Sequence, residues 1–338
     1  MKRTAAAQNL NDYISTCERQ MRCVHARSRA EARLIAKFES RGLLECVSAG
    51  LYARPDYWAG LKARQKHLHR VRALALRHPD WTFCSYTAAL VHGLSVSYRF
   101  LDDVHVWMPP SASSDVAGGV ARHRMKTFER TVELGIPVTP IAQTVVDCLV
   151  MSSFSEGLII ADSALRAGPL TKGELQAAVV RCGRHRRGVA LAKAVALCAD
   201  GLSESGGESK ARALMIERGW QVPELQVELP DLLELGRSYR VDFLWHVDGR
   251  IVIGEFDGRI KGENVPIEAE VIRTYFNERQ RESRLALFDD CKIVRICWDD
   301  LDDPECFDRK LELAGVPRAG FDAIDISALH YRGRRSGR

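Results

Sequence analysis

The chain has 338 residues, a formal net charge of +5, 46% hydrophobic residues and 28% charged residues. This composition excludes a wholly disordered protein, and the length suggests two or three domains. No run approaches the roughly 18 apolar residues needed to cross a bilayer, and the first residues lack the apolar core of a secretory signal. We therefore expect a cytoplasmic protein with no membrane partner.

Ten cysteines are scattered along the chain, and none belongs to a C-x-x-C pair. Structural zinc sites cluster their ligands at short spacing, and stable disulfides are mainly found outside the cytosol. Several cysteines lie inside apolar runs such as TVVDCLVM and KIVRICW. The pattern favours reduced, mostly buried thiols over a metal site or a disulfide framework.

Positive charge is concentrated near the N-terminus. Residues 1–80 contain 16 Lys and Arg against 7 Asp and Glu, an excess of nine that is larger than the net charge of the whole chain. Such a domain suits nucleic acid, because neutralising phosphates releases condensed counterions. A solvated charged surface is the alternative. The last nine residues add four arginines, and we expect residues 316–338 to form a flexible basic tail.

A basic amphipathic helix is predicted from about residue 30, with Ile35 and Phe38 on its apolar face and Gly42 as its C-cap. Apolar residues alternate with other residues along 44–53, on either side of a Ser-Ala-Gly turn. This pattern predicts a small hairpin. Helix followed by hairpin is the order of the recognition helix and wing of a winged helix-turn-helix; an ordinary helix–hairpin pair is the alternative. Residues 1–28 show no obvious first helix of that motif. The expected DNA-binding side chains are Arg29, Arg33, Lys37 and Arg41.

The middle of the chain is predicted to be mixed and then helical. Residues 56–78 predict one long basic helix, and residues 85–94 a short helix capped by Ser85. Short strands follow, and residues 140–199 have the pattern of successive helices. GLSESGG at 201–207 is typical of a linker. The expected domains are a winged helix at 1–82, a mixed α/β middle region at 83–200 and a further domain at 201–315.

The region after the linker predicts the order α-β-β-β-α-β. The strands are LQVELP, YRVDFLW, RIVIGEF and KIVRICW, and a long helix is expected over residues 268–290. Two strands are apolar enough to be central in a sheet that is covered on both faces. The predicted fold class is therefore α+β and multidomain.

This region has acidic residues at positions where burial of their charge would be costly. Asp242 is inside a strand, Glu255 ends the most apolar strand, and Asp257 and Lys261 follow it, while Glu208 opens the preceding helix. A buried carboxylate needs a partner, a metal or a raised pKa. Adjacent strand ends can bring such acids together as ligands for Mg²⁺, and a nearby lysine can stabilise a transition state. A fold kept for binding without catalysis is the alternative.

This order of elements resembles the PD-(D/E)xK nuclease superfamily, and in particular its very-short-patch-repair-like branch, with R-x-D-F followed by E-x-D-G. The resemblance implies a restriction-endonuclease-like domain with metal ligation by Asp242, Glu255 and Asp257, and with Glu208 as an auxiliary acid. The superfamily lysine would fall at position 257, where this chain has an aspartate; either Lys261 replaces it or the site is degenerate. The matching residues are Arg240, Asp242, Phe243, Glu255, Asp257 and Gly258.

The predicted helix over 268–290 has a polar face of Arg273, Asn277, Arg281 and Arg284. Their spacing of three or four residues suits contacts with phosphates, and Arg273 and Arg281 are the expected DNA contacts. A solvent face that is crossed by Glu278 and Glu282 is the alternative.

The N-terminal two thirds resembles AbiEi-type antitoxins of type IV toxin–antitoxin systems. Three segments carry the resemblance: Gly50-Leu51-Tyr52, SYTAALVHGL at 85–94 and IPVTPIAQTVVD at 136–147. It implies a winged helix that binds operator DNA and represses its own operon. We expect a transcription regulator that binds double-stranded DNA, with a toxin encoded nearby as a candidate partner. The alternatives are a Mg²⁺-dependent endonuclease targeted by the winged helix, and a non-enzymatic partner-binding protein.

Overall fold

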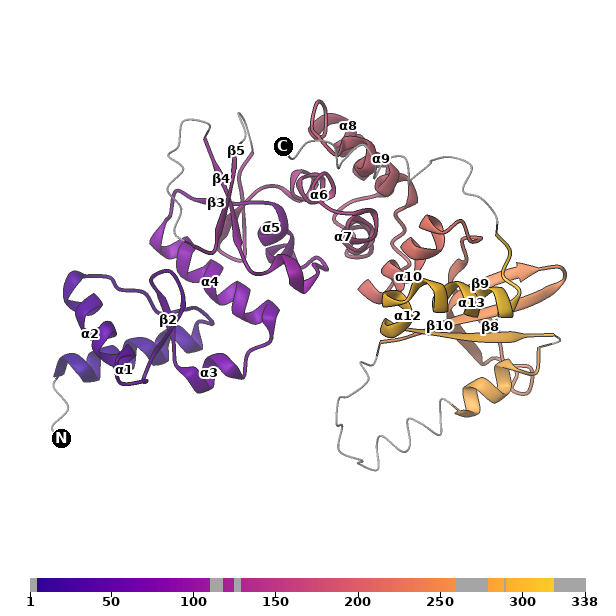
Figure 1. Cartoon of the computed structure of the whole chain (residues 1–338), viewed down its shortest axis with the longest axis horizontal. Coiled ribbons are helices and arrows are strands. Elements are labelled where there is room, and N and C mark those ends of the chain that lie inside the picture. The colour runs from indigo at the N-terminus through magenta and orange to yellow at the C-terminus, as the bar shows by residue number, and fades with distance from the viewer. Residues whose placement is uncertain (1–4, 110–117, 125–128, 259–278, 289, 319–338) are drawn as a thin grey trace. The chain divides into compact units, whose positions relative to one another are not determined.

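A computed structural model describes residues 5–109, 118–124, 129–258, 279–288 and 290–318 of the chain (Figure 1). The chain is mixed α/β and divides into two compact units, Met1–Cys148 and Leu149–Arg338. This division falls inside the 83–200 region that was expected to form one domain. Within the described ranges, no helix has the length and apolar character needed to cross a membrane.

The first unit begins with two helices that pack on each other. Helix α1 (Ala5–Arg19) lies within residues 1–28, where the sequence shows no obvious first helix of a helix-turn-helix. Helix α2 (Arg29–Glu39) starts at Ser28, whose side chain accepts a hydrogen bond from the Glu31 backbone N–H. Their shared core contains Leu10, Tyr13, Ile14, Cys17, Ile35 and Phe38. The helical spacing of its α1 members was the signal that had been missed.

A small hairpin follows α2, as predicted. Its strands are β1 (Glu45–Ser48) and β2 (Leu51–Ala53), and Gly50 in the turn has a φ of +70° that favours glycine. Val24 forms an antiparallel bridge to Tyr52 of β2. The connection from α1 to α2 covers residues 20–28 and is longer than the roughly three- or four-residue turn of a helix-turn-helix.

The hairpin shares its core with the sheet that follows. Leu51 packs in one cluster with Val71, Phe83, Val104 and Val138, so residues on both sides of the expected boundary at 82 belong to one unit. The helix expected over 56–78 is two helices, because the chain turns at Gly60. These helices are α3 (Pro55–Ala59) and α4 (Ala63–Arg77).

The sheet of this unit has the strand order β5-β4-β3-β7-β6, with both parallel and antiparallel neighbours. Helix α5 (Ser85–Val91) and a short 3₁₀ turn (Tyr98–Phe100) lie between β3 and β4 in the chain. The strands are β3 (Thr82–Phe83), β4 (Val104–Met108), β5 (Val120–Arg124), β6 (Thr131–Glu133) and β7 (Ile136–Val138).

Successive helices follow β7, as the sequence predicted, and from Leu149 onward they belong to the second unit. Helix α10 packs against α7, so the 201–207 segment is a turn within this unit and does not separate two units. Ser205 of that segment caps α10 by accepting a hydrogen bond from the Glu208 backbone N–H. The helices are α6 (Ile141–Leu149), α7 (Phe154–Arg166), α8 (Lys172–Cys182), α9 (Val189–Cys198) and α10 (Gly206–Glu217).

A four-stranded sheet with the order β11-β10-β9-β8 completes the second unit. All four predicted strands are present; β10 pairs antiparallel with β9 and parallel with β11. Of the helix expected over 268–290, the described residues are helical at 279–285. The elements are β8 (Glu224–Pro230), β9 (Ser238–Val247), β10 (Arg250–Asp257), β11 (Lys292–Cys297), α12 (Trp298–Asp302) and α13 (Pro304–Ala314).

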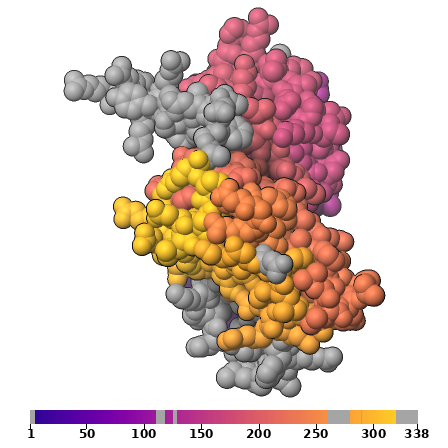
Figure 2. All heavy atoms as spheres, turned by 90° about the vertical axis from the view of Figure 1, so that its right-hand side faces the viewer, coloured from indigo at the N-terminus to yellow at the C-terminus, as the bar shows by residue number. Residues whose placement is uncertain are grey.

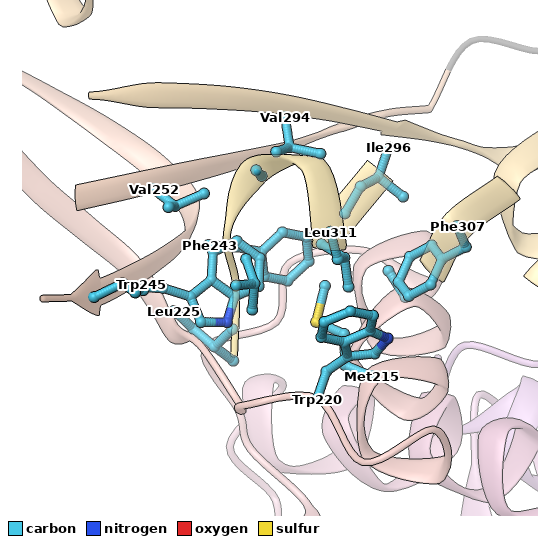
Figure 3. Close-up of a cluster of buried hydrophobic side chains, with 14 of the residues drawn as sticks. Met215, Trp220, Leu225, Phe243, Trp245, Val252, Val294, Ile296, Phe307 and Leu311 are labelled. Carbon is cyan, nitrogen blue, oxygen red and sulfur yellow. The ribbon is translucent and has the colours of Figure 1, made fainter. Parts of the chain in front are cut away.

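Both faces of this sheet are covered. On one face, α10 contributes Met215 and α13 contributes Phe307 to a core with Phe243 and Trp245 of β9 (Figure 3). On the other face, Leu285 of the helical segment packs with residues of β9 and β10. In the space-filling view, α12 and α13 form one continuous surface with the strands that precede them (Figure 2).

Candidate functional site

A carboxylate cluster forms where β9, β10 and α10 meet, and Asp242 is at its centre. Asp242 Oδ2 accepts a hydrogen bond from the Phe256 backbone N–H at 2.8 Å, and its Oδ1 accepts one from Gln226 Nε2 at 3.2 Å. The paired register of β9 and β10 ends at Gly254 and Phe243. The Asp242 carboxylate therefore binds a backbone N–H just beyond the paired ladder and ties the two strand ends together.

Gln226 is a member of the cluster that the sequence analysis missed. Its Nε2 donates to Glu208 Oε2 at 3.1 Å as well as to Asp242, so it links α10 to β9 through β8. The residue has a φ of +52°, an uncommon conformation for a residue with a side chain. A polar residue in a strand was the visible signal, but only the pairing of its neighbours, Leu225 with Phe243 and Val227 with Val241, brings it beside Asp242.

Glu208 reaches the cluster from the first turn of α10. Its Oε2 also accepts the Glu204 backbone N–H at 2.8 Å, and burial raises the pKa of the Glu208 carboxyl, with Asp242 adding to the effect. The neighbouring Gly207 lies against the Phe256 ring, where a Cβ would come within 2.0 Å of a ring carbon. A glycine is therefore what allows α10 to approach β10 and position Glu208.

Glu255 is bound by Arg281 from the helical segment at 279–285. Arg281 donates to Glu255 Oε1 at 2.8 Å and to Oε2 at 3.3 Å, and it also donates to the Arg240 carbonyl oxygen. Burial raises the pKa of Glu255 to about 7, although Arg281 lowers it, and the nearby Asp242 raises it further. The structure thus places Arg281, an expected phosphate contact, in the carboxylate cluster.

Of the other predicted site residues in this region, one lies at the end of β10 and two lie outside the described residues. Asp257 is half-buried at the end of β10 and is opposite Cys297 of β11. Arg284, on the same predicted polar face as Arg281, is bound to Asp231 and Glu234. Lys261 and Arg273 lie outside the described residues.

The carboxylate oxygens of the cluster are hard ligands of the kind that Mg²⁺ prefers, but protein N–H groups already compete for them. Both carboxylate oxygens of Asp242 and both of Glu255 accept hydrogen bonds. Among the residues that the structure describes, no three His, Cys, Asp or Glu side chains are grouped so that they could hold a metal ion. In this arrangement the cluster does not fit Mg²⁺.

A second candidate site is the outward face of α2 together with the turn that follows it. The side chains of Arg29, Arg33, Lys37 and Arg41 are all exposed, and within the described ranges none of them forms an ion pair. Ile35 and Phe38 hold the opposite face of the helix on α1. The first-turn acid, Glu31, is neutralised by Arg27, whose hydrogen bond lowers the Glu31 pKa.

More positive charge lies beside this helix. The Arg27 guanidinium stacks over the Tyr13 ring with its carbon 3.8 Å from the ring centroid. Burial lowers the pKa of His25, and the positive charges of Arg22, Arg77 and Arg27 lower it further. The face is therefore suited to an anionic partner.

No model of a known protein family matches this chain. Two curated proteins of Mycobacterium tuberculosis are similar to it: the uncharacterized protein Rv2248 of strain H37Rv and the uncharacterized protein MT2308 of strain CDC 1551 / Oshkosh. Each is 30% identical over 191 residues, which cover 56% of this chain and 68% of the relative.

Proposed function

The chain belongs to the family of the Mycobacterium tuberculosis proteins Rv2248 and MT2308, and we propose that it is a DNA-binding transcription regulator of the AbiEi antitoxin type. Its second unit contributes a nuclease-like domain that does not cleave DNA. The observation that carries the proposal is the row of four exposed basic side chains on and just after α2, from Arg29 to Arg41, without ion pairs among the described residues.

The position of this row suits a DNA duplex. An α-helix of about 10–12 Å diameter fits the major groove, which is about 12 Å wide. Each step of four residues from Arg29 to Lys37 rotates the side chain by about 40° around the helix, so these side chains spread over its outward face. Together with Arg41, just after the helix, they can meet phosphates on both sides of a groove. The hairpin that follows α2 lies in the same compact unit, as a wing does.

The electrostatics also favour DNA. The acid in the first turn of α2 is already paired with Arg27, so it does not cancel the charge of the row. Each Lys or Arg that neutralises a phosphate releases counterions, and we expect strong dependence of the affinity on salt.

The test is fluorescence anisotropy with duplex from upstream of the protein's own gene and with random duplex, over a salt series. We expect replacement of the row by glutamine to weaken binding and to reduce the salt slope by roughly 0.9 for each lost phosphate contact. The matched control removes the same charge from exposed positions of the second unit: Lys172, Arg181, Arg184 and Lys193.

Equal losses in the two quadruple variants would show that net charge, and not the α2 face, determines the affinity. If the upstream duplex bound no more tightly than random duplex, the regulator function would be excluded. The chain would then be a non-specific DNA-binding protein.

A Mg²⁺-dependent endonuclease is the alternative function, because Glu208, Asp242 and Glu255 belong to one cluster, although their present contacts do not fit Mg²⁺. Incubation of supercoiled plasmid with Mg²⁺ or Mn²⁺ tests it, beside the Asp242→Ala/Glu255→Ala double variant. We expect no cleavage by either protein. Cleavage by the unmodified chain alone would make it an endonuclease that the basic unit directs to its target.

A further inference from the structure

The carboxylate cluster of the second unit already contains a cation, the guanidinium of Arg281. We propose that Arg281 takes the place of a divalent metal ion in this cluster, so that the second unit does not bind Mg²⁺ or Mn²⁺. The inference rests on contacts within the second unit and is independent of DNA binding by α2.

The geometry of Arg281 is that of a planar donor facing several oxygens. One nitrogen, Nη2, donates to Glu255 Oε1 at 2.8 Å and to the Arg240 carbonyl oxygen, and the other, Nη1, donates to Glu255 Oε2 at 3.3 Å. Arginine presents its donors in a rigid fork and stays protonated, so its charge persists at any pH at which the protein is folded. It therefore satisfies both oxygens of the acid that ends the most apolar strand.

The remaining acids are also held by N–H donors. The backbone N–H of Phe256 donates to Asp242 Oδ2, and this donor is fixed by the strand itself. The side-chain Nε2 of Gln226 donates hydrogen bonds to both Asp242 and Glu208. A metal ion that bound both acids would compete with the guanidinium for Glu255, and with the Phe256 N–H and Gln226 for Asp242.

The charge of the cluster explains why a cation is retained. Asp242 is close enough to Glu255 for its negative charge to act on the Glu255 carboxyl, so the two carboxylates repel each other. The side chain of Glu255 is only 15% exposed, so water screens this repulsion weakly. A partly buried positive charge offsets it, and Mg²⁺, which gives up its water reluctantly, has little to gain by displacing that charge.

The experiment measures Mn²⁺ uptake by the full chain from the loss of the free Mn²⁺ signal in electron paramagnetic resonance. We expect no uptake by the unmodified protein and uptake of one Mn²⁺ per chain by Arg281→Met, which has similar length and no charge. Uptake should disappear in the Asp242→Asn/Arg281→Met double variant. Arg309→Met, which removes an arginine from an exposed ion pair on α13, is the matched control and should not bind Mn²⁺.

Two further variants keep the outcome decisive. Arg281→Gln is a second neutral variant in case the methionine protein does not fold, which circular dichroism will show, and Arg281→Lys retains the charge and should exclude Mn²⁺. Uptake by the unmodified protein that Asp242→Asn abolishes would overturn the proposal. So would the absence of uptake from a folded neutral variant, or equal uptake by the lysine variant.

Discussion

Arg212 Nη2 donates to both carboxylate oxygens of Asp162, at 2.8 and 2.7 Å, and the two side chains are 3% and 0% exposed. The pair joins α10 to α7, across the segment that the sequence analysis had expected to be a linker. Asp162 also accepts the Asp200 backbone N–H, and Arg212 donates to the Cys198 carbonyl oxygen. The turn at 199–205 is thus anchored from both sides, and α10 starts at a defined position relative to α7.

Replacement of Asp162 by alanine should lower the free energy of unfolding by about 3–5 kcal/mol, because Arg212 would be left buried without its counter-charge. Urea denaturation followed by circular dichroism measures the change. Lys210→Met on the same helix removes an ion pair with the exposed Asp302 and should cost less than about 1 kcal/mol. Equal losses in the two variants would contradict a special role for the buried pair.

Gly207→Ala should destabilise the second unit by about 1–3 kcal/mol, because its Cβ would come within 2.0 Å of the Phe256 ring. The neighbouring Gly206→Ala is the control, since its Cβ would meet Ile159 at 3.4 Å, an ordinary contact. Both changes improve helix propensity equally, so the difference in thermal unfolding temperature isolates the clash. A Gly207→Ala protein as stable as Gly206→Ala would show that α10 does not need this close approach.

Asp308 should make the second unit more sensitive to acid. Burial alone would raise its pKa, but hydrogen bonds from Arg218, Trp220 and Arg318 outweigh burial and hold the pKa at about 2. A carboxyl with a depressed pKa stabilises the fold above its unfolded value, near about 3.9, and this contribution is lost as the pH falls toward 2.

Asp308→Asn should therefore cost on the order of 1 kcal/mol at neutral pH, a value reduced by solvent screening, and little near pH 2. Urea unfolding of both proteins over a pH series measures it. Stability curves that stay parallel through this acid range would show that Asp308 titrates normally in the folded protein.

The thiols should differ sharply in reactivity. All ten cysteines are free, with Cys46 and Cys306 exposed. Burial raises the pKa of Cys23 to about 12 and that of Cys198 to about 11, which keeps them in the unreactive thiol form. A disulfide-exchange reagent should label Cys46 and Cys306 first and all ten only after unfolding, as peptide mass mapping can show. Rapid labelling of Cys23 in the folded protein would contradict its burial.

The sequence by itself determined the elements whose pattern is local. The period of Ile35 and Phe38, with charge on the other face, predicted α2, and the apolar runs predicted the strands of the second sheet and the position of Glu255 at a strand end. The free state of the cysteines also followed from their scatter. These features depend on residues a few positions apart, so the periodicity of a single segment contains them.

Only the tertiary structure decided which distant residues meet. Gln226 enters the cluster through strand register, and Arg281 reaches Glu255 across 26 positions of the chain. The 201–207 segment has the composition of a linker, yet the Asp162–Arg212 pair makes it a turn inside one unit. Such contacts depend on how helices and strands pack against each other, and the composition of a segment has no information about the partner that its side chains will find.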